Sequence, residues 1–385
     1  MMAEAHPGVR RARAAAAALS TLAIAACTTT AVSPTAPEGS TPEPPSASTT
    51  SQVIPQAADP RLRPVRIAVA GDIHFEGVLA DRLRDPATAL APAAAALAAA
   101  DLAIVNLETS VGTGGAPEPG KRYTFSTGPA AFTALSEAGV DVASMANNHA
   151  LDFGRSRLPS TLRGVRAAAT TDPALAVIGI GRDEDEAFAP ALTRIDDTTV
   201  ATLAASLADQ DPTADPTGDW AARGARPGIA DATDPSRLLE EVRRSDGAAD
   251  VVVVYLHWGI QGESCPSRDQ RSIATRLITA GADVVVGTHA HQLQGDGRLG
   301  RGYVAYGLGN FAWYSPGTDT TSRTGVLTLT VRPPSERSGR ARVLRATWQP
   351  ATIGPSGLPA PVAGEAAADF RADRQSLRAC ASLTG

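Results

Sequence analysis

The stretch RIAVAGDIH, residues 66–74, decides the fold, because an apolar run ends there in two polar side chains, Asp72 and His74. A short β-branched run of this kind is typical of a buried parallel strand. The same arrangement recurs at four further places. These are Asn106 and Glu108 after Leu102–Val105, Asn147, Asn148 and His149 after Val140–Ser144, His257 after Val251–Leu256, and His289 and His291 after Val284–Val286. Since the carboxyl ends of strands in an open α/β sheet line one edge, where ligands bind, the pattern predicts that five segments meet at one site.

The rest of the folded region alternates short apolar runs with amphipathic stretches. The further predicted strands are Ala176–Ile180, Thr199–Leu203, Tyr303–Tyr306, Val326–Val331 and Arg342–Trp348. The predicted helices are Leu79–Ala100, Pro129–Ala138, Arg155–Ala168, Pro235–Arg244 and Ser267–Ala280. The alternation in the first half predicts parallel βαβ units, whereas the last three strands, with no helix between them, favour antiparallel pairing. Together the elements indicate an α/β fold, a sandwich of two mixed sheets flanked by helices, with a loop or lid over Asp209–Gly228.

The first 27 residues are typical of an export signal. Three arginines precede an apolar run of 13 residues, Ala14–Ala26, whereas a bilayer span takes roughly 20. The ending Ile24-Ala25-Ala26-Cys27 is similar to a bacterial lipobox, which predicts a lipid on Cys27 and a place on the extracytoplasmic face of the cell membrane. A plain secretory signal with an incidental cysteine is the alternative. Residues 28–62, rich in Thr, Ser and Pro, are predicted to form a disordered tether, and residues 63–385 the folded domain with its C-terminal tail.

Two further cysteines, Cys265 and Cys380, are predicted to form a disulfide in an oxidising compartment. In the chain-entropy model a bridge that closes so long a loop stabilises the fold by about 4–5 kcal/mol. Two unrelated free thiols are the alternative. The formal net charge is −5, and no nucleic-acid-binding motif is present, so the sequence excludes a basic nucleic-acid-binding surface.

The types of residue at the strand ends limit the chemistry. Imidazole nitrogen and carboxylate oxygen together suit divalent metals such as Zn²⁺, Mn²⁺ or Fe²⁺. Seven or eight candidate ligands exceed the needs of one tetrahedral ion and would suit two ions roughly 3.5–4 Å apart, an arrangement that promotes displacement at phosphorus. Each group also has a simpler explanation alone, such as a turn aspartate, a capping asparagine or a packed core histidine. Their occurrence together at strand ends favours a common site.

Six motifs in consistent order resemble the CapA family of poly-γ-glutamate capsule synthesis proteins, within the calcineurin-like metallophosphoesterase superfamily. They are Gly71-Asp72-Ile73-His74, Asn106-Leu107-Glu108, Ala146–Gly154 (ANNHALDFG), His257-Trp258-Gly259, Gly287-Thr288-His289-Ala290-His291 and Tyr306–Phe311 (YGLGNF). The likeness covers about residues 65–315 and implies a metallophosphoesterase-like four-layer α/β/β/α sandwich.

The resemblance also implies a role for each matching residue. It makes Asp72, His74 and His291 ligands of a first metal, Asn148, His257 and His289 ligands of a second metal, and Glu108 the bridging carboxylate. His149 matches the acid that stands beside the metals. Asn106, Asn147, Asp152 and Asn310 look like residues that orient the ligands.

The chain departs from the family pattern at the rim of the site. Many relatives have an acidic residue soon after His-Trp-Gly, whereas here Gln261 follows and Glu263 comes later. Many also have a proline where this chain has Ala290, and Asp296 is only a loose counterpart of a usual glutamate. These departures put the substrate contacts in doubt more than metal binding. The sequence therefore favours a metal-dependent hydrolase acting on a phosphoester or an anionic envelope polymer. The lipid predicted on Cys27 would attach this protein to the membrane. A non-catalytic or amide-cleaving accessory protein for polymer synthesis or export is the first alternative, and a structural lipoprotein that has lost its metals is the second.

Overall fold

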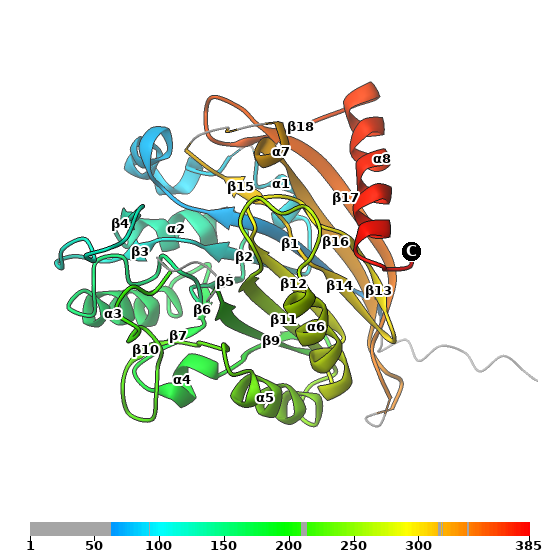
Figure 1. Cartoon of the computed structure of the whole chain (residues 1–385), viewed down its shortest axis with the longest axis horizontal. Helices are drawn as coiled ribbons and strands as arrows, with labels where there is room; N and C mark the ends of the chain where they lie inside the picture. The colour runs from blue at the N-terminus through cyan, green and yellow to red at the C-terminus, as the bar shows by residue number, and fades with distance from the viewer. Residues whose placement is uncertain (1–62, 92, 209–213, 315–316, 318, 337–338) are drawn as a thin grey trace, which may run out of the picture. The chain divides into compact units, whose positions relative to one another are not determined.

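A computed structural model describes residues 63–385, apart from residues 92, 209–213, 315–316, 318 and 337–338. The predicted export signal, Cys27 and the tether lie outside the described residues. Two mixed β-sheets form the centre of the described domain (Figure 1). Within the described ranges, no helix is both long and apolar enough to cross a membrane.

The first sheet has eight strands and is built around β1 (Val65–Ile73). On one side of β1 lie the parallel strands β2 (Leu102–Leu107), β5 (Val142–Ser144) and β6 (Ala176–Ile178). On the other side lie the antiparallel strands β16 (Arg323–Arg332), β17 (Arg342–Ile353) and β18 (Pro359–Pro361). The short strand β15 (Asn310–Ala312) pairs parallel with the end of β1 at Asp72 and Ile73. The predicted parallel first half and the antiparallel pairing of β16 with β17 are confirmed.

The second sheet has six strands in the order β13, β14, β12, β11, β9, β8. Their bounds are Asp296–Leu299 for β13, Gly302–Ala305 for β14, Val284–His289 for β12, Val251–Trp258 for β11, Thr198–Leu207 for β9 and Ala191–Ile195 for β8. The prediction of antiparallel pairing among the last three strands was wrong for β14, which pairs parallel with β12. The reason is the unpredicted strand β13, which forms a hairpin with β14, so that β14 runs in the same direction as β12.

Two further sheets have only two strands each. One pairs β3 (Ser110–Val111) with β4 (Ser126–Thr127), and the other pairs β7 (Ile180–Gly181) with β10 (Gly228–Ile229).

The alternation of side chains along β1 explains the layering. Ile67 and Val69 point into the core shared with the second sheet, whereas Ala68 and Ala70 point to the opposite face, because successive side chains of a strand alternate. That outer face packs against α2 (Ala130–Glu137) and α3 (Leu158–Ala168). The outer face of the second sheet is covered by α5 (Ser236–Asp246) and α6 (Arg268–Ala280), as Figure 1 shows. The expected α/β/β/α order of layers is therefore present.

One predicted helix was wrong. The stretch Leu79–Ala100 forms two 3₁₀ helices, η1 (Gly77–Arg84) and η2 (Pro86–Thr88), and the single turn α1 (Ala95–Ala98). Pro86 explains the break, since proline has no N–H to donate and restricts the residue before it, and Asp85 has an extended ψ of 84°.

Three helices were not predicted: α4 (Glu184–Phe188), α7 (Asp319–Ser322) and α8 (Gly364–Cys380). The longest of them, α8, forms the C-terminal tail and is fixed at several points. Phe370 packs on Trp348 of β17 with ring centroids 5.5 Å apart, and Arg374 binds Asp296 of β13 at 2.6 Å. The predicted disulfide between Cys265 and Cys380 is present, with Cα atoms 5.8 Å apart, and joins the end of α8 to the loop before α6.

Candidate metal centre

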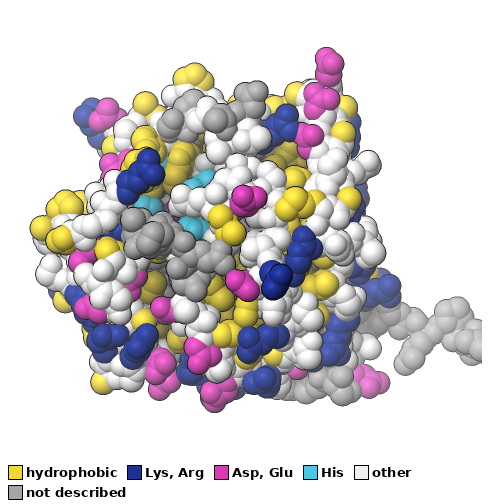
Figure 2. Space-filling model, viewed as in Figure 1, with side chains coloured by type: hydrophobic (Ala, Val, Ile, Leu, Met, Phe, Trp, Pro, Cys, Tyr) yellow, Lys and Arg dark blue, Asp and Glu magenta, His cyan; other side chains and the backbone are white. Residues whose placement is uncertain are grey.

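The polar side chains predicted to meet do so at the carboxyl ends of β1, β2, β5, β11 and β12. Asp72, Glu108, Asn148, His257 and His289 are each at most 3% exposed. The structure therefore brings side chains from five separate segments into one buried group, and histidine side chains lie in a hollow on the face that Figure 2 shows.

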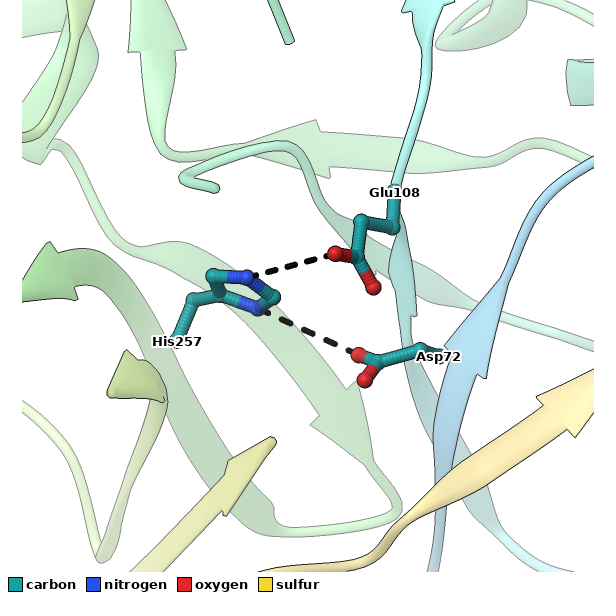
Figure 3. A group of neighbouring side chains, drawn as sticks. All are labelled: Asp72, Glu108 and His257. Carbon is teal, nitrogen blue, oxygen red and sulfur yellow. Dashed lines mark ion pairs between the residues drawn. The ribbon is translucent and has the colours of Figure 1, made fainter. Parts of the chain in front are cut away.

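The tightest part of the group is the trio of Asp72, Glu108 and His257 (Figure 3). One ligand atom from each lies within 4.8 Å of the others. His257 stands between the two carboxylates, with Nε2 3.5 Å from Glu108 Oε1 and Nδ1 3.9 Å from Asp72 Oδ1. Two carboxylates and an imidazole at this separation can share a divalent cation.

Glu108 lacks the partners that a buried carboxylate normally has. The residue is 0% exposed, and in the described part of the chain no donor gives a hydrogen bond to either of its carboxylate oxygens. Burial, and then the nearby Asp72 charge, raise the pKa of Glu108 well above its usual value. Burial also lowers the pKa of His257 and of His74 well below the usual imidazole value, so these rings are neutral. The site thus concentrates carboxylate groups beside neutral rings, an arrangement that a bound cation would stabilise.

A second set of contacts converges on His257 Nε2. Asn148 Oδ1 lies 2.7 Å from it, His289 Nδ1 3.0 Å, and Glu108 Oε1 3.5 Å. Ligand atoms around a tetrahedral zinc ion lie roughly 3.3–3.5 Å apart, given bonds of about 2.0–2.1 Å. Glu108 Oε1 is at this spacing from His257 Nε2, whereas Asn148 Oδ1 and His289 Nδ1 lie at hydrogen-bond distance and would have to move slightly apart to hold an ion.

Asp72 and His291 complete the group around Glu108. His291 Nδ1 lies 3.4 Å from Asp72 Oδ2, and its Nε2 lies 3.9 Å from Glu108 Oε1. Asn310 Oδ1 contacts the same Nδ1 at 2.8 Å. Both histidines of this loop have left-handed backbone, with φ of 87° at His289 and 54° at His291. Non-glycine residues rarely adopt this conformation, and such strain concentrates at functional sites.

His74 lies outside the tightest group. Its Nδ1 is 3.0 Å from the Glu76 backbone N–H and its Nε2 is 3.3 Å from that of Tyr314. A neutral imidazole has only one acceptor nitrogen, so only one of these contacts is a hydrogen bond. The ring stacks on Phe125 at 4.7 Å. Metal binding by His74 stays a prediction, and it would require one ring nitrogen to leave its backbone neighbour.

His149 is held by an aspartate three residues later. Its Nδ1 lies 2.6 Å from Asp152 Oδ2, and its Nε2 faces Glu108 Oε1 at 3.8 Å. Burial raises the pKa of Asp152 to about 7, against the lowering effect of Lys121. The ring of His149 is therefore oriented with one nitrogen toward Asp152 and the other toward the metal-ligand candidates.

The predicted orienting asparagines form a chain of hydrogen bonds. Asn106 Nδ2 donates to Asp72 Oδ1 at 2.8 Å, and Asn147 Nδ2 donates to Asn106 Oδ1 at 3.0 Å. The backbone N–H of His149 donates to Asn147 Oδ1 at 3.0 Å. Gly71 is required nearby, because a Cβ there would lie 1.9 Å from the carbonyl oxygen of Gly309. These contacts link three of the motifs through their polar side chains.

Sequence reasoning missed several neighbours of the site. Thr288 Oγ1 lies 3.0 Å from His257 Nδ1, and the ring of Trp313 lies 4.7 Å from that of His291. Phe125 stacks between His74 and His149. Lys121 forms an ion pair with Asp152 at 3.2 Å, and the signal that could have drawn attention to it is that it is the only lysine in the chain. Asp296, the loose counterpart of a family glutamate, instead binds Arg374 of α8.

Comparison with known proteins identifies the family. The family model for the bacterial capsule synthesis protein PGA_cap matches residues 66–315, which is well over half of the chain. The chain belongs to the PGA_cap family. All the candidate metal ligands of this PGA_cap protein fall inside the matched region.

Similar curated proteins bear related names. The capsule biosynthesis protein CapA of Bacillus anthracis is 30% identical over 47% of this chain and 42% of its own length. The PGA biosynthesis protein CapA of Bacillus subtilis is 30% identical over 50% of this chain and 48% of its own. A Mycobacterium tuberculosis protein named as a probable polyglutamine synthesis accessory protein is 27% identical over 62% of this chain and 64% of its own. This PGA_cap chain thus spans about half the length of the two CapA relatives that it matches.

Solved structures with a similar fold include two enzymes. A phosphatase of Mycoplasma pneumoniae matches 76% of this chain and 94% of its own length, with 13% identity and a TM-score of 0.44. A 5′-nucleotidase of Candida albicans matches 82% of this chain and 59% of its own, with 10% identity and a TM-score of 0.38. Likenesses at this level carry no argument about the activity of the PGA_cap chain.

Proposed function

We propose that this chain is an exported, lipid-anchored and metal-dependent hydrolase of the phosphoesterase type, linked to the metabolism of a capsule or poly-γ-glutamate-type envelope polymer. Glu108 carries the proposal. A carboxylate that is 0% exposed, has no hydrogen-bond donor among the described residues and lies beside Asp72 is costly to bury unless a cation neutralises it.

The residues present fit a pair of divalent metal ions. Asp72, His74 and His291 would hold one ion and Asn148, His257 and His289 the other, with Glu108 between them. Both sets combine oxygen and nitrogen donors, which suits Mn²⁺, Zn²⁺ or Fe²⁺. When bound, such a pair lowers the pKa of water and stabilises negative charge at a phosphorus centre.

His149 supports the hydrolytic part of the proposal. Its Nδ1 is held by Asp152 at 2.6 Å, and its Nε2 faces Glu108 Oε1 at 3.8 Å, so this nitrogen lies beside the candidate metal ligands. A histidine placed in this way can protonate the departing oxygen of an ester, and general acids contribute about 10²–10⁴-fold to such rates. We assign that role to His149.

A direct test is an activity screen of the purified domain loaded with Mn²⁺, Zn²⁺ or Fe²⁺, on an aryl phosphate and on anionic polymers. We expect metal-dependent hydrolysis that a chelator abolishes. Absence of turnover with every metal and substrate would count against a hydrolase, and full activity in the His149→Ala variant would count against His149 as its acid.

The names of the relatives favour a second candidate function, that of an accessory protein in the synthesis or export of an anionic polymer. In that case the metal centre would bind carboxylates of the polymer without cleaving them, or would cleave an amide. A deletion strain separates the two functions. Restoration of polymer by a His149→Ala variant that still binds metal supports a non-catalytic accessory role, whereas failure of that variant supports a catalytic one, and the activity screen then distinguishes phosphoester from amide cleavage.

Export and membrane attachment form a separate part of the proposal and rest on the N-terminal sequence. Replacement of Cys27 by serine is expected to release the protein from the membrane fraction. A Cys27→Ser protein that stays in that fraction after a salt wash would contradict a lipid anchor.

A further inference from the structure

Lys121 is unusual in both its burial and its residue type. The chain has 35 basic residues, and Lys121 is the only lysine among them. Its side chain is only 1% exposed. Lysine is almost never fully buried unless it is paired, because removing the ammonium group from water costs several kcal/mol. A single buried lysine in an arginine-rich chain therefore calls for a specific partner.

The ammonium group of Lys121 is surrounded by one carboxylate and two backbone carbonyl oxygens. It forms an ion pair with Asp152 Oδ1 at 3.2 Å and donates to the carbonyl oxygen of Asn148. The carbonyl oxygen of Ala214 lies 3.4 Å away, and the ring of Trp220 lies with its centroid 5.0 Å from Nζ. Lys121 thus links its own segment to two others, residues 148–152 and 214–220.

Two of these contacts lead directly to the proposed site. Asp152 uses its other oxygen, Oδ2, to hold His149 Nδ1 at 2.6 Å, and it also accepts a hydrogen bond from the Phe125 backbone at 2.7 Å. The Asn148 side chain points to His257 Nε2 at 2.7 Å, while the carbonyl group of the same residue is held by Lys121. One ammonium group therefore fixes both the aspartate behind His149 and the backbone of a candidate metal ligand.

We propose that Lys121 is a positioning residue for the reaction of this site: it holds Asp152, and through it the ring of His149, in the orientation that delivers a proton to the leaving group. The proposal rests on the proposed hydrolase function. Lys121 does not touch the substrate and acts only through Asp152 and Asn148. A purely structural counter-charge would stabilise the fold without affecting how the reaction depends on the leaving group.

The leaving group provides the test, because p-nitrophenolate departs without a proton whereas an alkoxide requires one. In the metal-loaded Lys121→Met variant we expect kcat for an alkyl phosphate to fall about tenfold or more, and kcat for p-nitrophenyl phosphate to fall less than about threefold. Lys121→Arg, which keeps the charge, should restore part of the loss. Equal losses on the two esters, with normal metal content, would overturn the proposal.

Arg157 offers a matched control. It is also a buried cation, 6% exposed, and its charge likewise lowers the pKa of Asp152, but its side chain donates to Gly114 O at 2.8 Å and Ser126 Oγ at 2.6 Å and forms no ion pair or hydrogen bond with Asp152. Arg157→Met is expected to lower stability while leaving the ratio of the two rates unchanged. A change in that ratio as large as in Lys121→Met would show that loss of any nearby buried cation suffices, and would overturn the assignment.

A second measurement separates this proposal from the proposed function. If the wild-type protein hydrolyses neither ester, the hydrolase function fails, and NMR of ¹⁵N-labelled histidine at one fixed pH then tests the positioning. The chain has only six histidines, so the ring signals can be assigned by substitution. We expect a protected Nδ1 proton on His149 in the wild type that is lost or shifted in Lys121→Met. An unchanged signal would contradict the positioning role.

Discussion

Replacing Glu108 by glutamine is expected to change stability in opposite directions with and without metal. In metal-free protein the buried carboxylate lies beside Asp72 without a donor, and this raises its pKa well above the usual value. Glutamine has nearly the same shape, carries no charge and can donate to the Asp72 carboxylate. The metal-free variant should therefore be at least as stable as the wild type, since the wild-type carboxyl group must either stay charged in a buried position or take up a proton on folding, and both cost free energy.

With metal present, the order should reverse. A metal at one hundred times its dissociation constant stabilises the folded state by about 2.7 kcal/mol, and each tenfold loss of affinity in the variant removes about 1.4 kcal/mol of that gain. For a domain of this size 1 kcal/mol corresponds to a shift in Tm of about 2 °C. The wild type should thus gain about 5 °C on addition of metal, and Glu108→Gln should gain clearly less.

Thermal unfolding of both proteins, in chelator and in excess Mn²⁺ or Zn²⁺, provides the assay. The matched control is Glu241→Gln, because Glu241 is also buried, at 6% exposed, but is paired with Arg237 and Arg244 on α5. That control should lose similar stability in both conditions. If Glu108→Gln behaved like the control, with an equal loss in chelator and in metal, Glu108 would not be a metal ligand and the reasoning would be refuted.

Three further predictions concern the acid, a buried carboxyl group and the disulfide. Metal-loaded His149→Gln should hydrolyse alkyl phosphates about 10²-fold or more slowly than the wild type while retaining its metal. Steady-state rates and elemental analysis check this prediction, and an unchanged rate would exclude His149 as the acid. Burial raises the pKa of Asp283 to about 7, above its value in the unfolded chain. The folded protein therefore loses stability as the pH rises from about 4 toward 7, because the unfolded chain ionises this carboxyl group more readily. Asp283→Asn should therefore gain stability relative to the wild type between pH 5 and 8, by up to about 4 kcal/mol in urea unfolding, and a pH-independent difference would contradict the burial effect. Cys380→Ser should lower the free energy of unfolding by about 4–5 kcal/mol in the chain-entropy model, and an effect below 1 kcal/mol in the same assay would show that the bridge between α8 and the loop before α6 is dispensable.

The sequence predicted best those features that depend on local periodicity. Continuous apolar runs such as Val251–Leu256 correspond to strands buried on both faces, and the polar residues that follow them lie at one edge of the sheets. The gathering of Asp72, Glu108 and His257 followed from that rule, because parallel strands place their carboxyl ends together.

Features that depend on tertiary contacts could not be predicted in this way. Helix α8 has many charged residues and gains its place from the contact of Phe370 with Trp348 and from the disulfide. The orientation of His74 depends on a ring of Phe125 that is distant in sequence. The partners of Lys121 come from two segments distant from it in sequence, so its role is visible only in the folded chain.

The metal content of the full-length protein, purified without chelator and measured by elemental analysis, tests the central claim most directly. The account predicts about two equivalents of divalent metal per chain, with a clear loss in Asp72→Asn and His257→Ala variants that remain folded. Protein that stays free of metal after exposure to Mn²⁺, Zn²⁺ and Fe²⁺, or that keeps its full metal content in both variants, would contradict it.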